Sequence, residues 1–143
     1  MESFDFVVIG GGSAGYAAAA AGARSGLKTV CIEGGKKLGG TCVLKGCMPS
    51  KTFIESANRF LTLRRANDFG LSAGHVAYDA EEIAQRKQKF VAEFEKYRGD
   101  QLMRGKFGFI RGQAEFVDSY HLKVKLLGGG EEEIEGKTFL IGE

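Results

Sequence analysis

The spacing of apolar positions changes twice along the chain. An opening run, "FDFVVIG", is rich in β-branched and aromatic residues and predicts a short buried strand. Alanines at 17–21 and 23 then predict a helix, and "LKTVCIE" predicts a second strand that ends at Glu33. Two longer helices are expected at about 51–69 and 79–103.

The second of these longer helices carries its apolar residues on one stripe: Ile83, Phe90, Val91, Phe94 and Tyr97. We expect both helices to pack on the domain core, or part of the stripe to face a partner subunit. After Gly105 apolar residues recur at every second position. This pattern predicts strands in the segments "FGFIRG", "AEFV", "HLKVKL", "EEIE" and "KTFLIG". Turns are expected at Asp118-Ser119 and at 128–130.

These patterns predict an α/β fold. Residues 4–33 read as a βαβ unit on a parallel sheet, as in a Rossmann-like domain. Two helices at about 51–104 follow, and an antiparallel β-meander at about 106–142 completes the chain. A chain of 143 residues is long enough for one domain with its own core.

Residues 10–15 read Gly-Gly-Gly-Ser-Ala-Gly, a G-x-G-x-x-G pattern between strand and helix. Gly10 permits the tight turn, Gly12 lets the backbone approach a pyrophosphate, and Gly15 lets the helix pack close to the sheet. The N-terminal N–H groups of the helix would face the phosphates. Glu33 is placed to accept hydrogen bonds from ribose hydroxyls and disfavours a 2′-phosphate. The pattern predicts a dinucleotide site without deciding between FAD and NAD.

Composition and charge narrow the class of protein. Hydrophobic residues make up 43% of the chain and the net charge is +2, so we expect a globular domain that binds neither nucleic acid nor a membrane surface. Residues 6–23 carry no charge, but glycines interrupt them, so we do not expect a membrane span. Three cysteines and no signal peptide point to a reducing cytoplasm.

Cys42 and Cys47 lie five positions apart in "GGTCVLKGCMPSK", residues 39–51. A metal site, a structural staple and a redox couple are the alternatives. We predict no metal site, because two further ligands close by are lacking. A regular helix would hold positions i and i+5 about 8 Å apart along its axis. A disulfide between Cys42 and Cys47 therefore needs an interruption of the helix, and Gly46 and Pro49 are suited to interrupt it.

Charge and burial separate these two cysteines from the third. Lys45 and Lys51 lie close to the pair in sequence and are expected to lower a thiol pKa. Cys31 stands inside an apolar strand, where an inert buried thiol is expected.

This segment resembles the redox-active motif of the flavin-dependent pyridine nucleotide–disulfide oxidoreductases, which include dihydrolipoamide dehydrogenase, glutathione reductase and mercuric reductase. The match runs from Gly10 through Lys51, and "IRGQAEFVD" at 110–118 is similar to a later segment of the family. The resemblance implies that residues 1–143 are the amino-terminal FAD-binding portion of a longer enzyme. It also implies that Cys42 and Cys47 are a redox-active disulfide.

The resemblance also implies a role for individual residues. The implied FAD contacts are Gly10, Gly12, Ser13, Ala14, Gly15, Glu33, Gly40, Thr41, Cys42, Cys47, Lys51 and Ala114. Glu33 would bind the ribose, Gly40 and Thr41 would line the pyrophosphate and isoalloxazine side, and Ala114 would contact the adenine end through its backbone.

The implied catalytic residues are Cys42, Cys47 and Lys51. Cys47 would face the flavin as the charge-transfer thiol, Cys42 would attack the substrate disulfide, and Lys51 would approach the flavin N5 region.

In the full-length family such a chain works with NAD(P)H as second cofactor, acts on a dithiol or disulfide substrate, and forms a homodimer. The sequence holds one G-x-G-x-x-G, so the NAD(P)H site is expected outside these residues. Two other interpretations stay open: a stand-alone flavin or nucleotide binder without turnover, and a redox-sensing domain without flavin.

Overall fold

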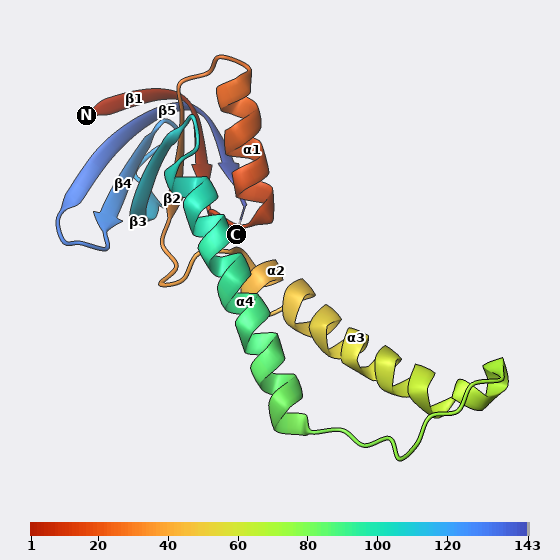
Figure 1. Cartoon of the computed structure of the whole chain (residues 1–143). Coiled ribbons are helices and arrows are strands. Elements are labelled where there is room, and N and C mark those ends of the chain that lie inside the picture. Colours follow the sequence, from red (N-terminus) through yellow and green to blue (C-terminus); the bar gives the residue numbers. More distant parts are fainter. Residues whose placement is uncertain (143) are drawn as a thin grey trace.

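The computed structural model describes residues 1–142; Glu143, the last residue of the predicted domain, lies outside them. The elements, in order, are β1 (Glu2–Ile9), α1 (Ser13–Arg24), β2 (Thr29–Glu33), α2 (Gly40–Leu44), α3 (Cys47–Arg64), the 3₁₀ helix η1 (Ala66–Phe69), α4 (Ala80–Met103), β3 (Gly108–Phe116), β4 (His121–Leu126) and β5 (Glu131–Ile141). Figure 1 shows the strands gathered at one end, with α1 beside them.

The five strands close on themselves in the order β1-β2-β3-β4-β5. Strand β1 pairs in parallel with β2 and with β5, and β2 pairs in parallel with β3. The β3–β4 and β4–β5 pairs are antiparallel. The α/β prediction of a parallel βαβ unit joined to an antiparallel meander is therefore confirmed.

Alternate residues of the strands fill the space inside this closed sheet. The inner core consists of Phe4, Val7, Ile9, Val30, Ile32, Leu122, Val124 and Ile134. The opposite faces of β1 and β2 carry Val8 and Cys31, which pack with Ala19 of α1 and Leu102 of α4. Helices α1 and α4 thus cover the outer face of β1 and β2.

Strands β3 and β5 are each longer than the sequence predicted. The alternation predicts "FGFIRG" and "AEFV" as separate strands, and likewise "EEIE" and "KTFLIG", but each pair forms one continuous strand. The reason is local packing at the glycine of each pair. A Cβ atom on Gly112 would lie 2.7 Å from Val124 Cγ1, and one on Gly136 would lie 2.7 Å from Val7 Cγ2, so neighbouring side chains occupy that space.

Helices α3 and α4 extend away from the sheet as a hairpin (Figure 1). The expectation that both helices pack on the domain core is wrong for most of their length. They pack against each other, and α4 reaches the core near its end, at Leu102. Along the predicted stripe, Phe94 is 39% exposed and Tyr97 is 58% exposed.

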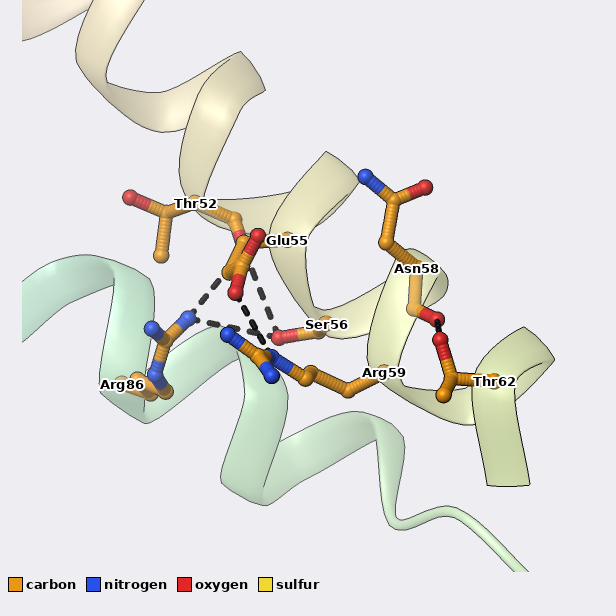
Figure 2. Close-up of polar contacts among 7 residues, drawn as sticks. All are labelled: Thr52, Glu55, Ser56, Asn58, Arg59, Thr62 and Arg86. Atoms are coloured by element: carbon orange, nitrogen blue, oxygen red, sulfur yellow. Dashed lines mark hydrogen bonds and ion pairs between the residues drawn. The ribbon is translucent and has the colours of Figure 1, made fainter. Parts of the chain in front are cut away.

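Arg86 of α4 joins the two helices of the hairpin. Its Nη1 atom donates to the Thr52 carbonyl oxygen (3.2 Å) and to Ser56 Oγ (3.3 Å), both on α3. Arg59 lies nearby but pairs with Glu55 of its own helix, at 2.7 Å (Figure 2). Among residues 1–142, no helix is long and apolar enough to cross a membrane.

Candidate dinucleotide and dithiol site

A cavity of about 510 Å³ opens at the carboxyl ends of the parallel strands, where open α/β sheets bind their ligands. Its lining residues are Ile9, Gly10, Gly12, Ser13, Ile32, Glu33, Gly34, Gly35, Gly40, Thr41, Cys42, Gly112, Gln113, Ala114 and Gly142. Its volume lies within the range of about 300–1,000 Å³ usual for small-molecule sites. Segments from five parts of the chain therefore meet at one edge of the sheet.

The N-terminus of α1 borders this cavity. Gly12 is the N-cap residue, no side chain caps the helix, and the first turn holds no acidic residue. The first N–H groups of a helix have no partner within the helix, so those of α1 remain available to an anion. The positive end of the helix dipole adds to this preference for negative charge.

Two glycines, Gly10 and Gly15, make the close packing around this turn possible. Gly10 has φ +98°, a conformation that side chains disfavour. A Cβ atom on Gly15 would lie 1.7 Å from the Gly10 carbonyl oxygen, so α1 and the turn touch backbone to backbone. A Cβ atom on Gly12, by contrast, would meet only Gly40 Cα at 3.6 Å and the Gly142 carbonyl oxygen at 3.8 Å, which are ordinary contacts.

Glu33, at the end of β2, holds two loops of the cavity. Its Oε2 atom accepts a hydrogen bond from the Gly11 backbone N (2.7 Å). Its Oε1 atom accepts one from the Gly35 backbone N (2.6 Å). The carboxylate is therefore fixed beside the fingerprint turn, and each oxygen keeps a lone pair for a ribose hydroxyl.

The opposite wall comes from α2 and β3. Gly40 has φ +66°, and a Cβ atom there would lie 2.7 Å from Gly12 Cα, so α2 begins against the fingerprint turn. On β3, Gly112, Gln113 and Ala114 line the cavity. Ala114 thus lines the cavity, and its contact with an adenine stays a prediction.

The helical structure is interrupted between the two cysteines of the motif. Cys42 lies on α2 and Cys47 is the first residue of α3, with Gly46 as its N-cap. The Gly46 N–H turns back to the Thr41 carbonyl oxygen (2.7 Å). Pro49 stands in the first turn of α3, where its missing N–H costs no hydrogen bond. Helix α3 therefore begins four residues before the predicted start at Lys51.

Both cysteines are half-buried free thiols that interact with each other. The hydrogen bond with Cys42 raises the pKa of Cys47, burial raises it further, and Lys51 opposes both by lowering it. The prediction that nearby lysines lower the thiol pKa is therefore wrong for Cys47 when both cysteines are thiols. The hydrogen bond with Cys42 raises its pKa more than the Lys51 charge lowers it. Lys45 is not among the causes of this pKa shift.

Cys31 behaves as the sequence suggested. It is fully buried, and burial, with the Glu33 charge as a smaller cause, raises its pKa to about 12. Its thiol is therefore protonated at neutral pH. Within residues 1–142, no group of three His, Cys, Asp or Glu side chains is placed to hold a metal ion.

The structure brings eight of the twelve predicted site residues to the cavity lining, and the other four are not part of that lining. Those that line it are Gly10, Gly12, Ser13, Glu33, Gly40, Thr41, Cys42 and Ala114. Ala14, Gly15, Cys47 and Lys51 do not line it. Gly15 packs against the Gly10 carbonyl group of the fingerprint turn. Cys47 begins the helix that follows the one carrying Cys42. Which of the two sulfurs would face a flavin stays a prediction.

Sequence reasoning missed several lining residues, chiefly Gly34, Gly35, Gly112, Gln113 and Gly142. One available signal was that the carboxyl ends of parallel strands share an edge, which places the residues after β2 and β5 there. The residues of β3 gave no such signal, because its pairing with β2 joins positions far apart in sequence.

A family model described as pyridine nucleotide-disulphide oxidoreductase matches residues 4–142. The chain belongs to the pyridine nucleotide-disulphide oxidoreductase family. Dihydrolipoamide dehydrogenase of Chaetomium thermophilum is 36% identical over 140 residues, covering 96% of this chain and 27% of that protein. Dihydrolipoyl dehydrogenase of Trypanosoma brucei brucei is 36% identical over 143 residues, covering 99% and 30%.

The fold of the chain also matches that of a solved structure. The Cu(II) complex of the HOCl-induced flavoprotein disulfide reductase RclA from Escherichia coli matches with a TM-score of 0.78 and 28% identity, over 99% of this chain and 29% of that one. The chain therefore spans 27 to 30% of the length of these three relatives. What the chain shares with RclA is the fold, over 99% of this chain.

Proposed function

We propose that this chain forms the FAD-binding part of an NAD(P)-dependent flavoprotein disulfide oxidoreductase of the dihydrolipoamide dehydrogenase type. The observation that carries the proposal is that one cavity joins the uncapped start of α1, the Glu33 carboxylate and the Cys42 thiol. Nucleotide recognition and dithiol chemistry thereby lie side by side.

The residues present fit an adenine dinucleotide. The uncapped first turn of α1 suits a pyrophosphate, and the space above Gly12 is free of side chains. Glu33 suits the ribose diol and Ala114 the adenine. FMN has no pyrophosphate and would leave the first turn of α1 without its ligand. FAD would supply the two-electron chemistry, with Lys51 close to the reacting ring.

Cys42 and Cys47 carry the thiol–disulfide exchange in this proposal. The Cys42 thiolate attacks one sulfur of a substrate disulfide, forms a mixed disulfide and releases the first substrate thiolate, which takes up a proton. Cys47 then attacks the Cys42 sulfur, the second substrate thiol leaves, and the Cys42–Cys47 disulfide forms. Two electrons reach the substrate, which becomes a dithiol. The reverse sequence oxidises a dithiol substrate.

The remaining parts of the proposal concern the complete enzyme. The nicotinamide partner is NADH or NADPH, the substrate is a small or protein-bound dithiol or disulfide, and the complete enzyme works as a homodimer in the cytoplasm. The dithiol or disulfide substrate is supported by the names of the relatives, which are a dihydrolipoamide dehydrogenase, a dihydrolipoyl dehydrogenase and a flavoprotein disulfide reductase.

The test is reconstitution of the purified chain with FAD, FMN or neither, followed by absorbance of the protein after gel filtration. We expect retained absorbance of oxidised flavin with FAD alone. Retention of FMN but not FAD would contradict the proposal, and so would a chain that retains neither flavin.

A further inference from the structure

Gly35 has both of its main-chain polar groups held by side chains from neighbouring strands. Its N–H donates to Glu33 Oε1 at 2.6 Å, and its carbonyl oxygen accepts from Arg111 Nη2 at 2.5 Å. We propose that Arg111 is a positioning residue: with Glu33 it clamps Gly35 and so orients the Glu33 carboxylate that selects an unphosphorylated adenosine ribose. This inference rests on the proposed function.

Strand register explains how two distant residues come to share this loop. Glu33 of β2 and Arg111 of β3 are register partners in a parallel pair, so both side chains leave the sheet on the same face. The ion pairs found among residues 1–142 do not include one between them; each side chain binds the loop instead. Arg111 Nη2 also reaches the Lys36 carbonyl oxygen at 3.3 Å.

The clamp continues to the fingerprint turn through Glu33. The oxygen that does not bind Gly35 accepts from the Gly11 N–H, and Gly35 itself lines the cavity. Four residues, Arg111, Gly35, Glu33 and Gly11, therefore form one chain of hydrogen bonds along the ribose side. Without Arg111 the loop loses its carbonyl anchor, and the carboxylate loses the fixed N–H that sets its rotation.

The Arg111 guanidinium does not fit a purely stabilising role. Its Nε atom is buried and has no hydrogen-bond partner among the described residues. A buried donor without a partner costs free energy, which offsets the bonds made by Nη2. Replacing Arg111 by an apolar side chain of similar length should therefore change the stability of the fold little while releasing the loop.

The test compares Arg111→Met and Arg111→Lys with Lys125→Met as a matched control. Lys125 is a cation of the same meander that pairs with Glu115 at 3.7 Å on the surface. FAD affinity is measured by flavin fluorescence. We expect Arg111→Met to weaken it about tenfold, as loss of one charge-assisted hydrogen bond would, with Arg111→Lys intermediate and the control unchanged.

A second readout measures selectivity, which a merely structural residue would not alter. Affinities for ADP and for adenosine 2′,5′-bisphosphate are compared in each variant. We expect the preference of the wild type for ADP to shrink in Arg111→Met, because a carboxylate free to rotate repels the 2′-phosphate less. The control should keep the wild-type preference.

A third readout needs no nucleotide: amide hydrogen exchange of Gly11 and residues 34–37 in the apoprotein. Exchange should accelerate in Arg111→Met and not in the control. If Arg111→Met showed the amide exchange rates and the FAD affinity of the wild type, the inference would be overturned. A wild type that binds no FAD refutes the proposed function. Amide hydrogen exchange in the apoprotein still tests whether Arg111 holds the Gly35 loop. Should Arg111→Met fail to fold, Arg111→Lys decides: it must show faster exchange and weaker FAD binding.

Discussion

Gly15 packs directly against the carbonyl group of Gly10, so closely that a Cβ atom would lie 1.7 Å from the oxygen. Because both partners are backbone, no side chain can move aside. We expect Gly15→Ala to lower the free energy of unfolding by about 3 kcal/mol or more, at the upper end for overpacking. Urea unfolding followed by circular dichroism measures this. Gly128→Ala, where an added Cβ meets nothing within 4 Å, should stay within about 0.5 kcal/mol.

Gly12 should separate ligand binding from folding. An added Cβ makes only ordinary contacts in the chain itself, so Gly12→Ala and Gly12→Val should fold. Both side chains occupy the space above the first turn of α1, where the pyrophosphate is proposed to lie. We expect FAD binding to be lost in Gly12→Val and weakened in Gly12→Ala, with thermal unfolding close to wild type. Gly74→Ala, in open space, is the control. Full FAD retention in Gly12→Val would contradict this site.

The three cysteines should differ in alkylation. Cys31 is fully buried with a pKa raised to about 12, so iodoacetamide should modify it only after denaturation. Cys42 and Cys47 are half-buried and should react in the reduced native protein. After mild oxidation we expect neither to react, because the pair has formed a disulfide. Peptide mass mapping reads all three sites, and labelling of Cys42 in the oxidised native protein would contradict the pairing.

The pKa of Cys47 should respond to its two neighbours in opposite directions. A raised pKa means less thiolate at neutral pH, so removing the raising partner should speed alkylation of Cys47. We therefore expect Cys42→Ala to shift the midpoint of the rate–pH profile to lower pH. Lys51→Met should shift it to higher pH, because a stabilising cation is lost. Lys45→Met is the control and should leave the midpoint unchanged; a profile that ignores Lys51 would refute this account.

Arg86 should contribute more to the α3–α4 hairpin than Arg59 does. Arg86 donates two hydrogen bonds across the helix pair and its guanidinium lies 4.9 Å from the Phe90 ring centre. Arg59 pairs within α3, with its side chain 79% exposed. We expect Arg86→Gln to cost about 1 kcal/mol and Arg59→Gln less than about 0.5 kcal/mol. Both changes remove one charge, so equal unfolding midpoints would show that the cross-helix bonds contribute nothing.

The βαβ unit, the fingerprint turn and the closeness of Cys42 and Cys47 along the chain can be read from the sequence, while the redox role of the cysteine pair is what the family resemblance implies. These features depend on neighbours within about 30 residues, and their side chains and glycines have few alternative uses. The resemblance to a flavin-dependent family followed from the same residues and is confirmed by the family match over residues 4–142. Ser13, Thr41 and Ala114 were placed at the cavity by that resemblance alone.

How distant segments of the chain meet could not be predicted from the sequence. Whether Gly112 and Gly136 end a strand or continue it depends on Val124 and Val7, which occupy the space of the missing Cβ atoms. The bond between Arg111 and Gly35 joins residues 76 positions apart and exists because β2 and β3 pair in one register. Such pairings reflect the packing of the whole sheet, since the local residue pattern around Arg111 is compatible with several registers.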